Sequence, residues 1–453
     1  MQENTLTTQP IPGLIRSIAI PASVGLFFNT MFNVVDTWFA GLIGTEAQAA
    51  LSLSLPVFFI LIAVGSGIQV GSMALIGSAL GEKRQNQACL YVVQTVSFGL
   101  VVSLLLAVFG IWFAPMLFRA MGAHGAYLET CMAYTVPIFS AAPAFLLIYM
   151  FNATLQATGD TKTMRNFLVL GAILNCVLDP WFIFGGLGIP AMGVAGVAWA
   201  TVLIQCVGSS YLLFKVRRTG LLHTGKGRNL IPRPRIFLDI ARQGLPASVN
   251  FLTIGMGMFI INTFVSDFGQ EAIAAYGVAT RVEQIALLPS IGLNVAALSI
   301  VAQNYGAGDI DRIRETMRTC LKYGAWIMLP AAVPVIALAR PFMNLFTKDE
   351  VVAAMGATYL RIDSLVFFGY VIIFVCTSAL QGMKRPMFAV WLGLWRQLAA
   401  PALLFWLCTR ILDLGLVSIW WSICLIVWTS AAIAYRYAAI NIQKLSSAPE
   451  TGR

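Results

Sequence analysis

The feature that most constrains this chain is a succession of long apolar stretches running through nearly all of its 453 residues. A transmembrane helix needs about 20 apolar residues, and charges, Gly/Pro turns and polar clusters divide the sequence into twelve such stretches. Their predicted limits are 12–40, 50–80, 88–117, 126–156, 163–187, 191–216, 239–267, 272–304, 312–342, 350–381, 386–412 and 416–442. The first is longer than the core of a signal peptide, about 7–15 residues, so we expect it to remain as a span. We predict an all-α integral membrane protein.

The composition excludes most other classes of protein. Charged residues make up 11% of the chain and the mean hydropathy is +0.81, whereas soluble proteins contain about 25% charged residues. A soluble enzyme, a DNA-binding module and a disordered chain are therefore excluded. The sequence has two histidines, no CxxC spacing and no Walker lysine, and so predicts neither a zinc site nor an ATP-driven pump. We expect no enzyme activity, and no cofactor other than a coupling ion.

The basic residues predict how the chain is oriented in the membrane. Of the 29 lysines and arginines, 21 lie in the loops on the side of the two termini. Four lie in the opposite loops, namely Arg119, Arg340, Lys348 and Arg410. Short cytoplasmic loops carry an excess of such residues, so we expect both termini in the cytoplasm. The net charge of +10 follows from this pattern and gives no reason to expect nucleic acid as a partner.

The longest polar segment divides the spans into two sets of six. We predict an N-terminal lobe at 12–216, a basic cytoplasmic linker at 217–238 and a C-terminal lobe at 239–442. The basic linker could bind lipid headgroups or RNA. A cytoplasmic loop that rests near anionic lipid has the same composition and needs neither function.

The two halves are related by an internal repeat with a constant offset of 225 residues. Pro21-Ala22-Ser23 recurs as Pro246-Ala247-Ser248, and Leu155-Gln156 recurs as Leu380-Gln381. Corresponding spans are an even number of crossings apart, so they run in the same direction. The repeat predicts twelve transmembrane helices in two six-helix lobes related by an axis along the membrane normal, as in parallel-repeat transporters.

Ionisable side chains inside a span cost about 2.5–3.5 kcal/mol each and are therefore candidates for function. In the first half these are Asp36 in span 1 and Asp179 in span 5, with Asn175 one helical turn before Asp179 on the same face. Two carboxylates in a medium of low dielectric cannot both remain bare anions, so we expect them to take up a proton or Na⁺. Alternatively, Asp179 ends its helix before Pro180, and Asp36 reaches the interface without a partner.

Further polar residues accompany the two acids. Span 4 contains Tyr134 and Asn152, and span 6 contains Thr201. With the carboxylates, these phenol, amide and hydroxyl groups would form an oxygen-lined pocket suited to a small cation. Pro21, fifteen residues before Asp36, removes a backbone donor and is expected to bend span 1.

The second half contains a different set of buried charges. Arg281 and Glu283 lie in span 8, and Arg361 and Asp363 lie in span 10. Residues two apart do not share a helix face, so we expect these residues to pair across helices, Arg281 with Asp363. Such a network could also serve structure alone. None of these charges recurs at the corresponding position of the first half, so the two lobes are expected to handle ions differently.

Several motifs together resemble one known family, the MATE (multidrug and toxic compound extrusion) transporters. They are Asn33-Val34-Val35-Asp36-Thr37, Gly44-Thr45-Glu46, Leu155-Gln156-Ala157-Thr158-Gly159-Asp160-Thr161, Asn175, Asp179-Pro180, Gly193-Val194-Ala195-Gly196, Ala200-Thr201 and Leu380-Gln381-Gly382. The resemblance covers about residues 12–440. It implies a twelve-helix, two-lobe antiporter that expels cationic, often aromatic, compounds against an inward gradient of H⁺ or Na⁺.

The resemblance also implies roles for residues of the first lobe. It assigns ion coupling to six side chains, namely Asp36, Tyr134, Asn152, Asn175, Asp179 and Thr201. Among them Asp36, Asn175 and Asp179 would hold Na⁺ if that is the coupling ion. Pro21 would bend span 1 when Asp36 is protonated or has bound an ion.

For the second lobe the resemblance is mixed. In the NorM branch of the family this lobe has a cation site made by a span-7 glutamate and a span-10 aspartate. The span-10 part is present as Tyr359 and Asp363, but Ile254 stands near the position of the glutamate. Arg281 and Glu283 look more like the DinF-type branch.

Together these features predict a secondary-active multidrug antiporter of the bacterial inner membrane. We expect small cationic drugs or dyes as substrates, surrounding lipid, no nucleic acid partner and a monomeric state. One alternative is a lipid-linked saccharide flippase of the same fold. Such flippases usually have a more cationic cavity, whereas this chain has four arginines and four acids within its spans. Another is a passive channel, which would conduct without ion coupling.

Overall fold

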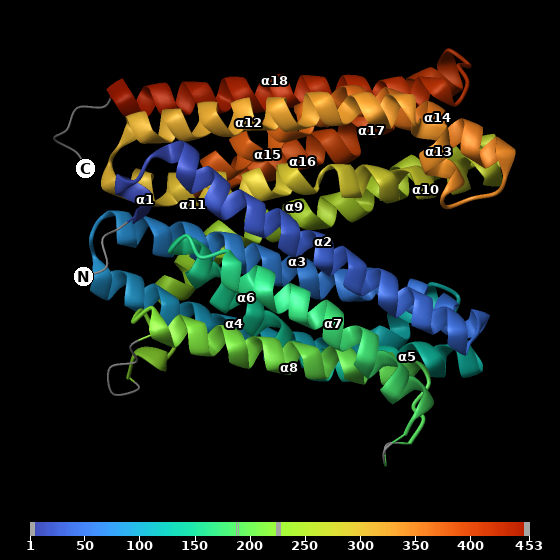
Figure 1. Ribbon diagram of the computed structural model, residues 1–453, viewed down its shortest axis with the longest axis horizontal. Helices are drawn as coiled ribbons and strands as arrows, with labels where there is room; N and C mark the ends of the chain where they lie inside the picture. Colours follow the sequence, from blue (N-terminus) through green and yellow to red (C-terminus); the bar gives the residue numbers. More distant parts are fainter. Residues whose placement is uncertain (1–4, 187, 189, 223–227, 448–453) are drawn as a thin grey trace. The chain divides into compact units, whose positions relative to one another are not determined.

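The structure, a computed structural model, describes residues 5–186, 188, 190–222 and 228–447, and these are almost entirely helical (Figure 1). The elements of the first half are α1 (Thr5–Thr8), α2 (Ile11–Ile43), α3 (Thr45–Gly81), α4 (Gln85–Ala120), α5 (Gly125–Ser140), α6 (Ala142–Ala157), α7 (Lys162–Phe184), α8 (Val194–Arg218) and η1 (Arg228–Leu230). Those of the second half are α9 (Pro234–Val265), η2 (Ser266–Phe268), α10 (Gln270–Ala286), α11 (Leu288–Ala307), α12 (Ile310–Ala337), α13 (Ala339–Asn344), α14 (Glu350–Asp363), η3 (Ser364–Val366), α15 (Phe367–Gly382), α16 (Met387–Leu394), η4 (Trp395–Ala399), α17 (Ala400–Trp406), η5 (Leu407–Ile411) and α18 (Val417–Ser447).

The twelve predicted spans are confirmed. Within the described residues, ten helical segments are long and apolar enough to cross a membrane. Two bent pairs, α5 with α6 and α10 with α11, bring the number to twelve if each is one span. The bends measure 49° and 48°, and both spans were predicted as continuous helices. Irregular backbone inside a membrane is tolerated where the protein itself or a water-filled cavity satisfies its polar groups.

The chain divides into two compact units. We call Val24–Ser248 the first unit, and Met1–Ser23 together with Val249–Arg453 the second unit. The predicted lobes, 12–216 and 239–442, differ from these units at two helices. The first part of α2 groups with the second unit, and the first part of α9 groups with the first unit.

Two glycines explain why α2 and α9 group in this way. A Cβ on Gly292 of α11 would lie 2.1 Å from the Ser23 Oγ of α2, and a Cβ on Gly67 of α3 would lie 1.9 Å from the Ser248 Oγ of α9. Real Cβ atoms do not approach other atoms so closely, so glycine permits both helix contacts. The two contacts are related by the repeat offset of 225 residues, and the internal duplication is thus visible in the packing.

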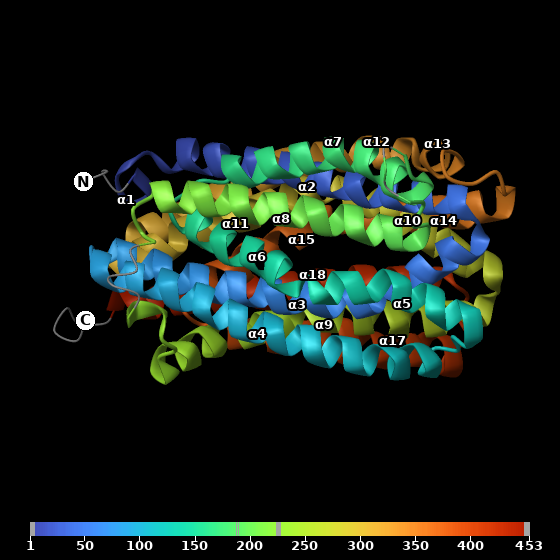
Figure 2. The ribbon, with the colours of Figure 1, turned by 90° about the horizontal axis from the view of Figure 1, so that it is seen from below.

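Each unit has its own apolar core. In the second unit α15 packs against α11 and α18, around Phe367 and Trp420. In the first unit α6 packs against α3 and α8, around Leu61 and Leu146. Helix α7 lies along α8, as both views show (Figures 1 and 2). The contacts of α6, α7 and α8 hold the helices that carry Asn152, Asn175, Asp179 and Thr201.

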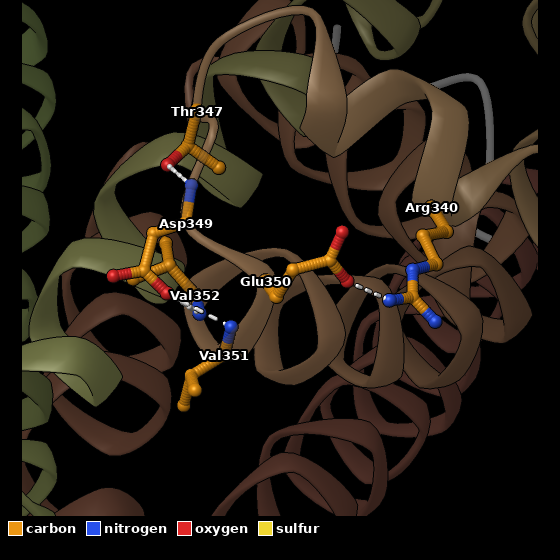
Figure 3. Close-up of polar contacts among 6 residues, drawn as sticks. All are labelled: Arg340, Thr347, Asp349, Glu350, Val351 and Val352. Atoms are coloured by element: carbon orange, nitrogen blue, oxygen red, sulfur yellow. Dashed lines mark hydrogen bonds and ion pairs between the residues drawn. The ribbon is translucent and has the colours of Figure 1, made fainter.

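Helix α14, which carries Tyr359 and Asp363, has a well-defined start (Figure 3). The Asp349 carboxylate accepts hydrogen bonds from the backbone N–H groups of Val351 and Val352, at 2.8 and 3.1 Å. It satisfies donors that the helix itself leaves unpaired. Beside it, Arg340 of α13 forms an ion pair with Glu350. The cap thus fixes the beginning of a helix whose last turn holds a buried acid.

The predicted linker, 217–238, is shorter in the structure. Helix α8 continues to Arg218 and α9 already begins at Pro234. Between them, the Gln94 Nε2 of α4 donates hydrogen bonds to the carbonyls of Asn229 and Ile231, at 2.6 and 2.8 Å. Residues 223–227 of the linker lie outside the described part of the chain. Binding of lipid headgroups by this segment stays a prediction.

Candidate functional site

The acid predicted in span 1 pairs with an amide of span 5. Asn175 of α7 donates a hydrogen bond from its Nδ2 to the Asp36 Oδ1 of α2, at 2.8 Å. Asp36 is 8% exposed and Asn175 is fully buried. A carboxylate in such surroundings is stable only with a donor or a positive charge. The amide supplies one donor and no charge.

Asp179 completes the pair on the same face of α7. It is fully buried, and neither of its carboxylate oxygens has a hydrogen-bond partner within the described part of the chain. Its carboxyl group faces that of Asp36. Ionised carboxylates can only accept hydrogen bonds, so the two cannot bond to each other until a proton or a metal cation lies between them. The site therefore lacks one positive charge.

The remaining predicted residues of the first unit differ in burial and in hydrogen bonding. Tyr134 of α5 is 6% exposed and lies close enough to both carboxylates to interact with their charges. Asn152 of α6 is 4% exposed, and its Oδ1 has no hydrogen-bond donor. Thr201 of α8 is buried, but its Oγ1 donates to the Val197 carbonyl of its own helix at 3.0 Å. Tyr134 and Asn152 thus have polar groups without a hydrogen-bond partner among the described residues. The Thr201 hydroxyl has used its hydrogen and can only accept hydrogen bonds or bind a cation.

A metal cation at this pair would need ligands other than carboxylates. Among the described residues, no cluster of three or more His, Cys, Asp or Glu side chains could hold a metal ion. The Asn175 Oδ1, which is buried without a donor among the described residues, is an amide oxygen available to complete a Na⁺ site with Asp36 and Asp179. The donor set fits either one proton or one Na⁺.

Pro21 lies in α2 within the second unit, whereas Asp36 lies in the same helix within the first unit. Helix α2 continues from Ile11 to Ile43 through the proline. A bend of this helix in response to ion binding at Asp36 stays a prediction.

The second unit contains its own buried acidic cluster. The Tyr359 hydroxyl of α14 donates a hydrogen bond to the Glu283 Oε2 of α10, at 2.7 Å. Asp363 lies one turn beyond Tyr359, next to Glu283, and is 3% exposed. Among the residues that the structure describes, neither of its oxygens has a hydrogen-bond partner. Tyr359 occupies the repeat position of Tyr134, 225 residues earlier. The duplicated tyrosine therefore lies beside a carboxylate pair in each unit, although the carboxylates come from unrelated positions.

The predicted pairing of Arg281 with Asp363 is wrong. Arg281 and Arg361 are both exposed, and Asp363 has no hydrogen-bond partner. Residues two apart point in different directions from a helix, so turning Glu283 and Asp363 inward turns both arginines outward. On each helix the acid, half-buried Glu283 or buried Asp363, thus lies away from the exposed arginine two residues before it.

The sequence prediction missed the cation of this cluster. Arg396 lies over the Tyr370 ring, 5.8 Å from its centroid, and its charge and the Tyr370 hydroxyl both face Glu283. Arg396 belongs to the π-helix η4, whose wider turn changes which side chains share a face. An arginine in span 11 was visible in the sequence, but its inward direction was not. The rings of Tyr276, Tyr359 and Trp420 enclose the cluster, with centroids 4.9–5.7 Å apart.

A polytopic helical protein with buried carboxylates that lack fixed counter-ions belongs to the class of membrane transporters, because such residues mark ion and substrate pathways. The family is more specific. The chain belongs to the MatE family, whose profile matches residues 21–181 and 246–404. The two matches begin at Pro21 and Pro246, the two copies of one repeat position.

Relatives and solved structures agree with this assignment. The chain is 30% identical to YoeA of Bacillus subtilis, named as a probable multidrug resistance protein, over 84% of this chain and 83% of that one. It is 27% identical to an FAD transporter of Shewanella oneidensis, over 86% of each. A solved MOP superfamily transporter of Pyrococcus furiosus is 25% identical and superposes with a TM-score of 0.92 over 99% of each chain. The chain is thus a MatE-family membrane transporter with multidrug resistance proteins among its relatives.

Proposed function

We propose that this chain is a secondary-active antiporter that exports cationic, amphipathic compounds in exchange for inward H⁺ or Na⁺. The observation that carries the proposal is the carboxylate pair of the first unit. Asp36 and Asp179 are buried face to face, the Asn175 amide donates to Asp36 alone, and no cationic side chain of the described residues pairs with either acid. Such a pair binds one monovalent cation. The affinity of the pair for that cation falls when water or neighbouring side chains stabilise the two carboxylates in its place.

Coupling follows from the difference in affinity between two states of the transporter. An ion that binds more tightly to one arrangement of the protein shifts the population toward it, and a substrate with the opposite preference shifts it back. The coupling is reciprocal, so a bound ion must weaken drug binding by the same factor by which the drug weakens ion binding. We propose that Asp36, Asp179, Asn175 and Asn152 are the residues whose contacts differ between the states.

Relatives that are multidrug resistance and multidrug export proteins support small drugs or dyes as the cargo. A second candidate cargo is a flavin dinucleotide, because one relative at 27% identity is an FAD transporter. The two cargoes have opposite charge. They can be distinguished by presenting each to the same vesicles.

The proposal includes the location and state of the protein. The excess of lysine and arginine in alternate loops supports cytoplasmic termini, and bacterial relatives support the inner membrane of a bacterium. We propose that the transporter works as a monomer surrounded by lipid. Reporter fusions at both ends, active only in the cytoplasm, test the orientation.

The proposal is tested in liposomes that contain the purified protein and a cationic aromatic dye or FAD. Transport is compared under a pH gradient, a Na⁺ gradient and no gradient. We expect movement of one cargo under one ion gradient, its loss in Asp36→Asn, and unchanged transport in the control Asp311→Asn, whose side chain is 91% exposed. Equal flux without any gradient, or full gradient-driven transport by Asp36→Asn, would overturn the proposal.

A further inference from the structure

The second unit contains a set of charges that the proposed coupling at Asp36 does not use. Glu283 comes from α10, Asp363 from α14 and Arg396 from η4. The three belong to one unit, and their formal charges sum to one negative. At the repeat position of Arg396 the first unit has Gly171, and no lysine or arginine of the described residues is among the groups that act on Asp36 and Asp179. The two carboxylate pairs thus differ in whether an arginine is built in.

Within this set Glu283 is the acid with partners. It accepts the hydrogen bond of the Tyr359 hydroxyl at 2.7 Å. The Tyr370 hydroxyl and the Arg396 guanidinium face it from α15 and η4. A carboxylate with a charged guanidinium and phenolic donors around it is stable as an anion, even when it is half-buried. Glu283 therefore has the Tyr359 hydroxyl as its hydrogen-bond donor and the charge of Arg396 in its surroundings.

Asp363 is the acid without partners. Both oxygens are buried with no donor, and the side chain is 3% exposed. The groups that face it are Glu283 and Tyr276 of α10, Tyr359 of its own helix, Tyr370 of α15 and the Cys424 thiol of α18. None of these carries a positive charge. An anion in this position repels Glu283 and has lost its water, so Asp363 is the group that must take up a cation.

We propose that Arg396 makes this carboxylate pair a site for one proton that excludes Na⁺ and K⁺. A proton binds to Asp363 alone and turns it into a neutral hydrogen-bond donor. A metal ion instead needs oxygens from both carboxylates, and Glu283 already accepts the hydrogen bond of the Tyr359 hydroxyl. A metal ion between the acids would also lie near a fixed positive charge, which raises its energy in a low-dielectric site. Arg396 is thus a specificity-determining residue.

The proposal predicts a difference between the two units. Asp36 and Asp179 have the Asn175 amide beside them, and amide oxygens are Na⁺ ligands, so the first pair accepts either ion. The second pair has an arginine and aromatic rings, so it accepts a proton. The role of this site in transport rests on the proposed function. Its ion selectivity does not, because selectivity is measured by ion binding alone.

The test measures ion binding in nanodiscs, in a parent protein with Asp36→Asn and Asp179→Asn so that the first pair cannot contribute. Radioactive Na⁺ and infrared spectra of protonated carboxyl groups are the two readouts. We expect no saturable Na⁺ binding by the parent and a protonated carboxyl band that disappears in Asp363→Asn. In the parent, Arg396→Gln should increase Na⁺ affinity at least about tenfold by removing a like charge. Adding Asp363→Asn should abolish the gain.

Two further variants separate charge from folding. Arg396→Lys keeps the positive charge and should keep the exclusion of Na⁺. Arg396→Met, an apolar replacement of similar length, should gain Na⁺ binding as Arg396→Gln does, and gives the same test if the glutamine variant does not fold. Na⁺ binding by the parent that Asp363→Asn removes would overturn the proposal. So would a folded glutamine or methionine variant with no gain. Because no step measures transport, failure of gradient-driven export would leave this outcome unaffected.

Discussion

Replacement of Asp179 by asparagine should stabilise the protein and at the same time abolish ion-coupled transport. Asp179 is fully buried, faces Asp36, and has no donor on either oxygen. Asparagine has nearly the same shape, carries no charge and adds two N–H donors. One of these can reach the Asp36 carboxylate. In the variant the Asp36 carboxylate thus has a permanent hydrogen-bond donor, and the pair no longer requires a cation.

The size of the effect follows from the groups that are left unpaired. A buried polar group without a partner costs about 1–3 kcal/mol, so Asp179→Asn should raise the free energy of unfolding by about that amount. For a unit of some 200 residues, 1 kcal/mol corresponds to about 2–4 °C in Tm. We therefore expect Tm to rise by about 2–12 °C.

The assay combines thermal unfolding in detergent with dye transport in liposomes. The matched control is Asp311→Asn, because the Asp311 side chain is 91% exposed and surface changes stay within about 0.5 kcal/mol. We expect a higher Tm with no gradient-driven transport for Asp179→Asn, and neither change for the control. A lower Tm, or transport that still follows the ion gradient, would refute the reasoning about the pair.

The other predictions concern the packing and the capping of helices. Gly292→Ala should destabilise the second unit by about 1–3 kcal/mol through overpacking, since the new Cβ would lie 2.1 Å from the Ser23 Oγ. Gly255→Ala should instead stabilise this unit by about 0.4–1 kcal/mol, because no described atom lies within 4 Å of its Cβ. Thermal unfolding of both variants checks the opposite signs, and equal shifts would contradict them. Asp349→Ala should cost about 0.5–2 kcal/mol by removing the cap of α14, and Asp349→Asn should retain most of that stability; equal losses in the two variants, in the same melting experiment, would show that the cap does not stabilise the helix.

The positions of the spans could be predicted because hydropathy is a local property of the sequence. A long apolar stretch has one stable arrangement in lipid, so the twelve limits followed without knowledge of packing. The breaks of α5–α6 and α10–α11 were not predicted, although Pro143 and Pro289 stand just after them at helix starts. Proline is also present within unbroken spans, for example Pro21 in α2. The residue type alone therefore does not locate a break.

The site was predictable where a single residue type carried the information. A carboxylate inside a span is conspicuous, and Asp36, Asn175 and Asp179 lie together in the structure as expected. Partners across helices were not predictable, because pairing depends on the rotation of each helix about its own axis. The Arg281–Asp363 pairing failed for this reason. Arg396 was missed because the π-helix η4 shifts the direction of its side chains, and no periodicity in the sequence signals that shift.

The central claim is that ion and drug compete through Asp36 and Asp179. The direct measurement is the release of ions when a cationic dye binds to the purified protein in nanodiscs, in a weakly buffered solution monitored for both H⁺ and Na⁺. The account predicts that binding of each dye molecule releases about one ion from the wild-type protein, and none from the variant with Asp36→Asn and Asp179→Asn. Dye binding by the wild-type protein that releases no ion, with an affinity independent of pH and of Na⁺, would contradict it.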